Sequence, residues 1–394
     1  FFTKRQIDSK KGENMDMRKE IRIEEGKLKV VFEIRDNGVV ELKQFDPFGR
    51  IDAKEKKREA EDFYPITEIQ ITGKGSRGMH AYKHNASSGS IDFTYQSHEI
   101  TENEKGKELV IYTATEYGAK GEYHMQFYPG TAAVQVWTVL KNEGTEAIGL
   151  EYVSSFIYQG LCQNGEKPYF EKTNVYTPCN SWDSESQWRK NDCREINLSG
   201  MAVDGFNTPG FGMNRYCYGG HSSWSTCEYL PMGICEDTEC KETYFFQIEH
   251  SGQWLIEYGP STGERLYVAL SGATESEQGW WKNLKPGDTF TTVPACFGVS
   301  DGGVNEAMAE LTEYRRKIRR PNEDDEKLNV VFNDYMNCLM GDPTEEKEKA
   351  IIDKAAEMGC EYYCLDCGWY DKGFWWDRVG EWKESSERFP NTLK

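Results

Sequence analysis

The stretch VVFNDYMNCLMGDPTEEKEKAIIDKAAEMGCEYYCLDCGWY, residues 330–370, contains a strand pattern, a helix pattern and a second strand pattern in close succession. The apolar run at its start has strand length. Asp342 followed by Pro343 predicts a helix N-cap and a first helical residue whose φ angle is already set. Gly359 stands where a C′ glycine ends a helix, and a second apolar run follows at once. We therefore predict one βαβ unit with parallel strands.

Asp366 comes directly after the second predicted strand. In α/β barrels and open α/β sheets, the carboxyl ends of parallel strands open into the crevice that holds the chemistry. A carboxylate at such a position accepts hydrogen bonds from paired hydroxyl groups, and neighbouring aromatic rings offer flat faces to the C–H face of a sugar ring. Trp369 and Tyr370 follow within four residues. The pattern indicates a sugar-binding rim.

Six short motifs of this region resemble the opening of the catalytic barrel in glycoside hydrolase family 36, the α-galactosidases. In chain order they are FNDYMN, GDPTEEK, AAEMG, EYYCLDCGWY, VGEW and RFP. A looser likeness extends backwards through SWDSESQWR, SSWSTCEYLPMG and LKPGDTFTT. The resemblance covers most of the chain, and it implies a multidomain β and α/β protein: a large antiparallel β-supersandwich followed by the start of a (β/α)8 TIM barrel.

The resemblance also implies roles for single residues. Asp366 matches the aspartate that binds galactose hydroxyls at the far end of the sugar, so it is expected to bind and not to catalyse. Cys367 stands where many members carry a second Asp, and Tyr335 where others have Trp. Trp382 matches an aromatic position in a barrel loop, and Asp334 is either a ligand at the mouth or a cap of the strand. The predicted substrate-binding residues are Asp366, Cys367, Trp369, Tyr335, Asp334 and Trp382.

Catalytic residues are not expected within the chain. Glycoside hydrolysis needs two carboxylates flanking the scissile bond, one as nucleophile and one as general acid/base in a retaining enzyme. A closed (β/α)8 barrel takes roughly 250 residues, whereas 65 follow Asn329. We therefore expect a fragment with a truncated barrel that is inactive alone. The resemblance places both carboxylates beyond Lys394.

Composition narrows the classes of partner. The chain has 394 residues, 38% of them hydrophobic, which predicts a globular protein of two or three domains. The net charge of −19 argues against nucleic acid and against an anionic membrane surface. No run of eighteen apolar residues exists and the first residues lack the apolar region of a signal peptide, so we expect a cytoplasmic protein without membrane contact. The family likeness adds a homo-oligomer and no cofactor.

The 12 cysteines are scattered along the chain, which predicts buried free thiols. Cys364 and Cys367 form a CxxC along a predicted strand, where residues three apart point to opposite faces and do not readily share an ion. Cys227, Cys235 and Cys240 have no His spaced to complete a zinc site. We predict no metal site.

From about Ile21 to Phe297 the sequence repeats short alternating runs between turn signals, such as DNG at 36–38 and NEG at 142–144. Both are hairpin-type turns, and their regular spacing is typical of antiparallel sheets packed as a sandwich. A helical stripe of Met308, Leu311, Tyr314 and Ile318 follows, and then an acidic hinge. We predict an N-terminal extension at 1–19, a β-supersandwich at 20–302, a linker helix and hinge at 303–328, and the barrel start at 329–394.

Residues 177–233 show little strand pattern and are rich in Trp, Asn, Ser and Gly. A long irregular stretch in a compact domain is usually functional or flexible. One interpretation places it at the substrate pocket of the same or a neighbouring subunit, and the other makes it a packed surface loop. The residues concerned are Trp182, Trp188, Arg189, His221 and Trp224.

The leading hypothesis is a retaining exo-glycosidase that, as the intact protein, hydrolyses terminal α-galactosyl residues of oligosaccharides. An α-N-acetylgalactosaminidase or a galactosyltransferase of the same fold differs from it in the sugar released or in the acceptor. A non-catalytic carbohydrate-binding β-sandwich module is an alternative of another class, and it predicts sugar binding by the sandwich alone.

Overall fold

The computed structural model describes residues 19–49, 64–76, 83–199, 214–261 and 265–393. Contacts divide the chain into two units, Phe1–Ile318 and Arg319–Lys394, which are described separately. The expected N-terminal extension lies outside the described residues, except for Lys19. In the described part of the chain, no helix is long and apolar enough to cross a membrane.

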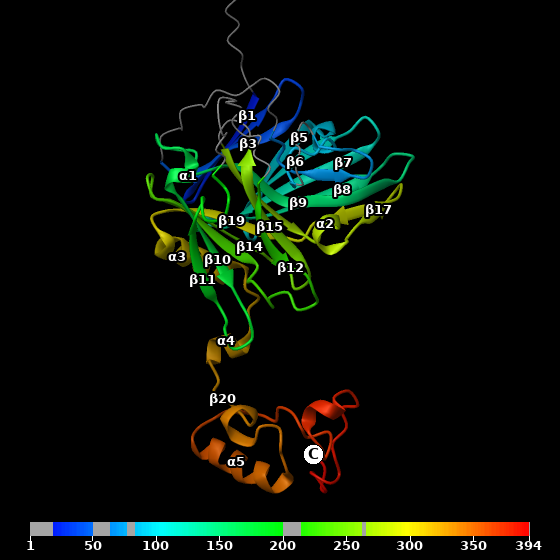
Figure 1. Cartoon of the computed structure of the whole chain (residues 1–394), viewed down its shortest axis with the longest axis vertical. Coiled ribbons are helices and arrows are strands. Elements are labelled where there is room, and N and C mark those ends of the chain that lie inside the picture. The colour runs from blue at the N-terminus through cyan, green and yellow to red at the C-terminus, as the bar shows by residue number, and fades with distance from the viewer. Residues whose placement is uncertain (1–18, 50–63, 77–82, 200–213, 262–264, 394) are drawn as a thin grey trace, which may run out of the picture. The chain divides into compact units, whose positions relative to one another are not determined.

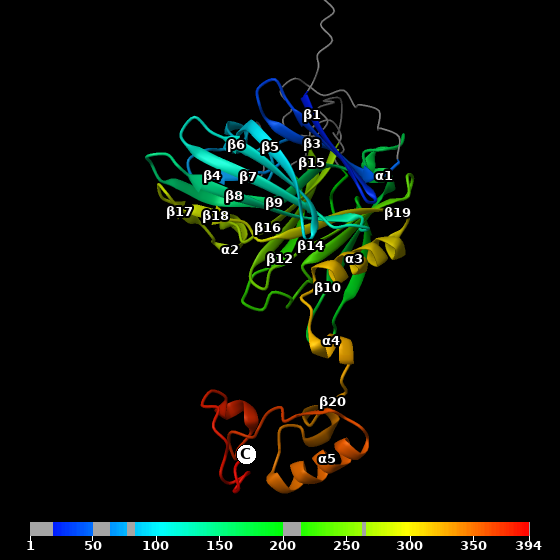
Figure 2. The same cartoon turned by 180° about the vertical axis from the view of Figure 1, so that it is seen from behind.

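Antiparallel sheets make up the described residues of the first unit, and the largest has ten strands (Figures 1 and 2). In spatial order its strands are β11 (Gln187–Asp192), β10 (Thr173–Cys179), β13 (Met232–Asp237), β14 (Glu242–Ile248), β19 (Ala295–Asp301), β8 (Ala133–Asn142), β7 (Ala119–Phe127), β6 (Gly106–Ala114) and β5 (Thr94–Asn103), with β18 (Thr289–Thr291) beside β8. The prediction of antiparallel sheets is confirmed.

The described residues of this unit also form two smaller sheets. One runs β12 (Tyr216–Gly220), β15 (Trp254–Ser261), β16 (Arg265–Gly272), β9 (Ile148–Leu161) and β17 (Lys282–Leu284), with β4 (Ile69–Ile71) beside β9. The other runs β1 (Lys19–Glu25), β2 (Leu28–Ile34) and β3 (Val40–Pro47). Three short helices, η1 (Ser90–Asp92), α1 (Tyr169–Lys172) and α2 (Glu275–Gln278), lie in the connections.

Apolar side chains from all three sheets form one buried core. Phe297 of β19 lies at its centre and has no exposed surface. Its ring centroid is 4.4 Å from that of Phe156 on β9 and 4.9 Å from that of Phe45 on β3. Because each partner comes from a different sheet, this aromatic cluster holds the three sheets together.

The two predicted hairpin turns have different outcomes. Gly38, in the DNG turn, has a φ of +86°, and β2 and β3 pair across it as predicted. The hairpin prediction for NEG is wrong, because β8 before it belongs to the ten-stranded sheet and β9 after it to the six-stranded sheet. Asn142 donates to the carbonyl oxygens of Glu146 and Leu284, both at 2.8 Å, and so fixes a crossing between sheets.

The helix α3 (Val304–Ile318) packs against the ten-stranded sheet, through β14 and β19 (Figure 2). Leu311 and Tyr314 of the predicted stripe are buried, and Met308 and Ile318 pack partly against the same cluster. The Tyr314 hydroxyl donates to Glu249 Oε1 at 2.7 Å. This segment therefore covers apolar surface of the sandwich.

The second unit contains the predicted βαβ unit. The strands β20 (Val331–Asn333) and β21 (Tyr362–Cys364) pair in parallel, and α5 (Glu345–Glu357) connects them. Gly359 has a φ of +86° just after the helix, as a C′ glycine should. The remaining short helices are α4 (Glu323–Lys327), η2 (Tyr335–Leu339) and η3 (Trp375–Arg378). α4 lies where a hinge was expected.

The predicted N-cap of α5 is wrong. Thr344, and not Asp342, caps the helix, because the Thr344 hydroxyl accepts from the Lys347 backbone N–H at 3.4 Å. Asp342 instead accepts from Arg388 Nη1 at 2.8 Å and from Lys347 Nζ at 2.5 Å. Arg388, which is distant in the sequence, and Lys347, on the first turn of the helix, both bind the Asp342 carboxylate. Asp342 therefore does not cap the helix, although its residue type favours capping.

Thr344→Ala is expected to destabilise the first turn of α5 by about 1 kcal/mol, since one backbone N–H loses its side-chain acceptor. Amide hydrogen exchange in that turn should then become about 5-fold faster. Thr344→Ser keeps the hydroxyl and should exchange like the unmodified chain. Equal exchange in all three proteins would show that this cap contributes nothing.

Candidate functional site

Asp366 lies two residues past the end of β21, and its side chain is exposed. Its carboxylate Oδ2 accepts a hydrogen bond from Asn333 Nδ2 at 2.8 Å. Its backbone N–H donates to Asp334 Oδ1, also at 2.8 Å. Asn333 and Asp334, at the end of β20, thus hold the carboxylate and the backbone of Asp366, which follows β21.

Asn333 orients the Asp366 carboxylate, a role for which the sequence contains no signal. While its amide nitrogen donates to Asp366, its Oδ1 accepts from the backbone N–H of Tyr335 at 2.8 Å. Asp334 beside it is 2% exposed, so it is a buried support of the rim and is not open to a ligand. Of the two interpretations of Asp334, this geometry favours the strand-end cap.

A second buried carboxyl group lies behind Asp334. Glu348 of α5 is 4% exposed and accepts a hydrogen bond from the Tyr363 hydroxyl. Burial raises the pKa of Glu348, and the hydrogen bond from Tyr363 lowers it in part. The neighbouring Asp334 carboxyl raises it again, so that the pKa of Glu348 is about 7. The layer beneath the rim therefore gains a negative charge when Glu348 ionises near neutral pH.

The stability of the second unit should fall as the pH rises from about 5 to 8. The folded unit holds the Glu348 proton up to about pH 7, whereas an unfolded chain releases it near its ordinary pKa of about 4.3. The stabilisation is therefore complete below the unfolded pKa and is lost as the pH passes the folded one. Its size is on the order of 2 kcal/mol.

Glu348→Gln is neutral at every pH, so its α5 amides should exchange at nearly constant protection between pH 5 and 8, after correction for the intrinsic rate. The unmodified chain should lose roughly 10-fold or more of protection over the same range. Glu357→Gln, at an exposed position of the same helix, is the matched control. Parallel profiles for Glu348→Gln and the unmodified chain would contradict this assignment.

Cys367 is half-buried next to Asp366. Burial raises the pKa of its thiol to about 11, and the charge of Asp366 and a hydrogen bond to it act in the same direction. Cys367 therefore remains a neutral thiol near pH 7, and it cannot act as a second carboxylate acceptor.

Two groups of aromatic rings flank these polar residues. The ring centroid of Trp369 is 5.3 Å from that of Tyr370 and 6.2 Å from that of Trp382, which is 56% exposed. Tyr335 instead packs edge-to-face on Trp375, with centroids 5.7 Å apart. The structure thus brings the predicted residues Trp369 and Trp382 together, and it pairs Tyr335 with Trp375.

Arg388 holds the loop that carries these rings, a role the sequence did not reveal. Its guanidinium is 9% exposed and donates to Asp342 Oδ1 and to the Pro343 carbonyl at 2.8 and 2.9 Å. It also donates to the carbonyls of Lys372 and Gly373, each at 3.1 Å. One buried cation therefore ties the loop after β21 to the start of α5.

The candidate loop at 177–233 is less irregular than expected, since it contains β11 and β12; residues 200–213 of it lie outside the described residues. Trp182 and Trp224 are 69% and 53% exposed and meet edge-to-face with centroids 6.4 Å apart. Trp188 packs partly against the cluster under α3. Arg189 and His221 are exposed. Of the five predicted pocket residues, the structure therefore brings together Trp182 and Trp224, as an exposed pair.

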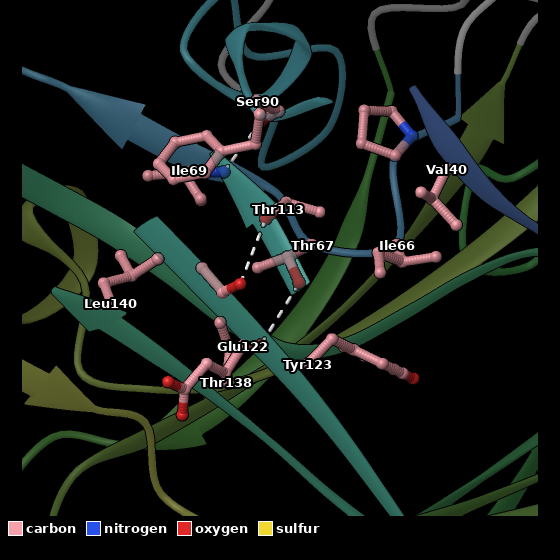
Figure 3. A pocket seen from close by; sticks show the side chains of 13 residues that line it. Val40, Ile66, Thr67, Ile69, Ser90, Thr113, Glu122, Tyr123, Thr138 and Leu140 are labelled. Atoms are coloured by element: carbon pink, nitrogen blue, oxygen red, sulfur yellow. Dashed lines mark hydrogen bonds between the residues drawn. The ribbon is translucent and has the colours of Figure 1, made fainter. Parts of the chain in front are cut away.

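A cavity in the first unit holds about 350 Å³ of space, part of it open to solvent (Figure 3). Most of its polar lining is already bonded within the protein, although the buried Tyr123 hydroxyl has no hydrogen-bond partner there. The Thr67 and Thr138 hydroxyls lie 3.1 Å apart and face each other, and the Ser90 hydroxyl accepts from the Ile69 backbone N–H at 2.8 Å. Mutually paired hydroxyls among apolar side chains leave few groups to orient a sugar, so we assign no ligand here.

Comparisons with known proteins identify relatives of this chain. A family model described as melibiase matches residues 289–394. The α-galactosidase Mel36A of Lactobacillus acidophilus is 25% identical over 344 residues, which are 84% of this chain and 43% of that protein. The chain is similar to the family 36 α-galactosidases over most of its length. It spans about half the length of these relatives.

Solved structures of family 36 share the fold. The α-galactosidase AgaA of Geobacillus stearothermophilus has a TM-score of 0.73 at 17% identity, over 95% of this chain and 54% of that one. AgaB from the same organism has a TM-score of 0.74 at 16% identity, over 96% and 53%. The expected family 36 fold is thus confirmed. The βαβ unit agrees with the start of a (β/α)8 barrel, and the described residues form no closed barrel.

Proposed function

We propose that the protein is a retaining exo-glycosidase that releases terminal α-galactosyl residues from oligosaccharides. The motif series and the similarity to α-galactosidases support this class of substrate. AgaA, a structural relative, has been solved in complexes with raffinose and with stachyose. The chain's own part in this activity is to bind the galactosyl group.

The observation that carries the proposal is the placement of Asp366. It is an exposed carboxylate at the carboxyl end of a parallel strand, and Asn333 and Asp334 hold it in position through 2.8 Å bonds. Held in this way, the carboxylate accepts hydrogen bonds from two adjacent sugar hydroxyls and loses little freedom on binding. Trp382, exposed beside Trp369, offers a flat face to the C–H side of the ring.

The proposal assigns no nucleophile or acid/base to this chain. Asp334 and Glu348 are buried beneath the rim and cannot reach a glycosidic bond from there. Asp366 binds the sugar at the end away from the scissile bond. Its contribution is positioning, which places the anomeric carbon where two further carboxylates of the complete enzyme would flank it.

We further propose that the enzyme is a cytoplasmic homo-oligomer in which the exposed pair Trp182 and Trp224 borders the pocket of a neighbouring subunit. Two adjacent exposed indoles on a strongly acidic protein suit a neutral partner such as a sugar. Trp182→Ala should then raise KM for an oligosaccharide more than KM for a small aryl galactoside. Unchanged KM values for both substrates would remove the pair from the pocket.

The test uses the polypeptide encoded by the whole gene, assayed on p-nitrophenyl α-galactoside and p-nitrophenyl α-N-acetylgalactosaminide. We expect hydrolysis of the galactoside, with α-galactose as the first product, as retention requires. Preference for the N-acetylated substrate would move the enzyme to the alternative within the fold. Calorimetric binding of galactose by the 394-residue chain that survives Asp366→Ala would favour a binding module in the sandwich.

A further inference from the structure

A chain of hydrogen bonds in the first unit joins an acid, a histidine and a serine that are far apart in the sequence. Glu257 of β15 and His84, in the segment before η1, are bonded between Oε2 and Nδ1 at 2.8 Å. The other ring nitrogen, Nε2, lies 3.2 Å from the hydroxyl oxygen of Ser276 in α2. This connectivity is that of a serine nucleophile, its general base and the group that orients the base.

The three residues differ in exposure in the way such a site requires. His84 and Glu257 are each 1% exposed, so neither meets bulk water. Ser276 is exposed, so an incoming molecule approaches the chain of bonds from this end; its hydroxyl oxygen also lies 3.2 Å from that of Thr274. A buried histidine and carboxylate alone are an ordinary part of a core. A histidine–carboxylate pair that only stabilises the core does not need a third residue, at the surface, whose hydroxyl bonds to Nε2, as Ser276 does here.

Glu257 is held as a carboxylate by several donors. Its Oε1 accepts from the His84 backbone N–H at 2.8 Å and from the Tyr267 hydroxyl, and its Oε2 also accepts from Arg215 Nη1 at 2.9 Å. Burial alone would raise the pKa of Glu257, but the hydrogen bonds from His84 and from Tyr267 hold it below its ordinary value. The acid is therefore ionised throughout the neutral range.

This arrangement fixes the histidine for a base's role. An ionised carboxylate at Nδ1 selects the tautomer with its proton there, which leaves Nε2 as the acceptor for the Ser276 hydroxyl proton. The ring also packs on Tyr152, with centroids 4.4 Å apart, and this contact restricts its rotation. Orientation and tautomer are both set before any ligand arrives.

We propose that Ser276 is an activated nucleophile with His84 as its general base and Glu257 as a positioning residue, and that the site accepts small uncharged carboxylic esters. Glu275 precedes the serine and is exposed, so its charge disfavours an anionic acyl group, whereas the charge of Glu277 is paired with Arg215. This activity lies outside the proposed galactosidase function and does not depend on it.

The reaction closes with water as the only co-reactant. As Ser276 Oγ bonds to the carbonyl carbon, its proton passes to His84 Nε2. The C–O bond to the leaving alkoxide then breaks and the alcohol takes that proton. Water attacks the serine ester and gives a proton to Nε2, which returns it to Oγ as the acid leaves. The net change is ester and water to acid and alcohol.

The first experiment treats the 394-residue chain with a fluorophosphonate probe and locates the label by peptide mass spectrometry. We expect Ser276 to react at least 10-fold faster than Ser184, an exposed serine in a turn of the same unit. Ser276→Ala should abolish that label and reduce hydrolysis of p-nitrophenyl acetate at least 10-fold, while Ser184→Ala changes neither. Equal labelling of the two serines, or a dominant label elsewhere, would overturn the proposal.

A second variant tests the base without disturbing the core, since His84→Gln could unfold the protein. Ser276→Cys changes only the exposed end of the chain of bonds, and its thiol is alkylated with iodoacetamide as a function of pH. A neighbouring histidine base should move the midpoint at least one pH unit below that of Ser184→Cys, which should lie near the ordinary value of about 8.5. Coincident midpoints would show that His84 does not activate this position.

Other titrating and charged groups near His84 could also change the pH dependence of alkylation at Ser276→Cys. They are Glu257, Arg215, Glu277, Lys83, Tyr152 and Tyr267. Among them, Lys83 has its pKa lowered to about 8 by burial, so it titrates within the measured range. Lys83→Met therefore accompanies the thiol variant, and the shifted midpoint should persist in the double variant. If the midpoint of the double variant returned to that of Ser184→Cys, the shift would be due to Lys83, and the role given to His84 would be wrong.

Discussion

Asp366→Ala is expected to lower kcat/KM of the complete enzyme on p-nitrophenyl α-galactoside by about 10²–10⁴-fold. A hydrogen bond to a charged group contributes roughly 1.5–3 kcal/mol, and two such bonds to sugar hydroxyls correspond to about that range of rate. The variant also leaves the Asn333 amide without the carboxylate it orients. The loss of these bonds from the bound substrate should raise KM, and the less precise placement of the anomeric carbon should lower kcat.

The protein should nevertheless remain folded, since the Asp366 side chain is exposed and its anchoring bond to Asp334 comes from the backbone N–H. Asp377→Ala, at an exposed position of η3, is the matched control and should change kcat/KM by less than about 2-fold. A similar loss in both variants, or a loss of folded protein in the first, would contradict the role given to Asp366.

Phe297→Ala is expected to destabilise the first unit by about 3–5 kcal/mol. The ring is fully buried, and its neighbours Phe45, Phe156 and Phe246 come from three sheets that cannot all move inward to fill the space. Urea unfolding followed by near-ultraviolet circular dichroism measures the loss. Because the chain has two units, the transition of the first must be resolved from that of the second.

Phe48→Ala is the control for this change, because Phe48 is 57% exposed and should alter stability by at most about 0.5 kcal/mol. Phe297→Leu keeps most of the volume and should cost less than half as much as the alanine variant. A loss below about 1 kcal/mol for Phe297→Ala would show that the aromatic cluster does not join the sheets.

The elements that sequence reasoning recovered are those with a strong local pattern. The βαβ unit was predictable because apolar periods change from strand to helix and back, with Gly359 marking the helix end at a φ that favours glycine. The position of Asp366 followed from the same pattern, because a residue just past the carboxyl end of a parallel strand lies at the open edge of the sheet.

The elements that escaped prediction depend on partners distant in the chain. The turn at 142–144 has hairpin chemistry, yet the strands beside it already pair with other strands in separate sheets. Thr344 caps α5 because Asp342 is engaged by Arg388, 46 residues away. Glu348 looks like any helix-surface glutamate, and only the fold places its carboxyl beside Asp334. Such contacts leave no periodic trace in the sequence.

The hydrogen-bonded set of Glu257, His84 and Ser276 is an extreme case. His84 is separated from Glu257 by 173 residues and from Ser276 by 192. None of the three lies in a motif with a fixed spacing, and serine nucleophiles are recognised by geometry and role and not by sequence order. Only the packing of β15, the segment before η1 and α2 reveals them.

The central claim is that the Asp366 carboxylate accepts hydrogen bonds from galactose hydroxyls. Its most direct test measures kcat/KM of the complete enzyme and of Asp366→Asn on aryl α-galactosides that each lack one hydroxyl. The account predicts that the variant loses at least 10-fold on the parent substrate and that this loss shrinks to about 2-fold or less for at least one deoxy substrate. An equal loss on every substrate would contradict it, because Asp366 would then act without touching the sugar.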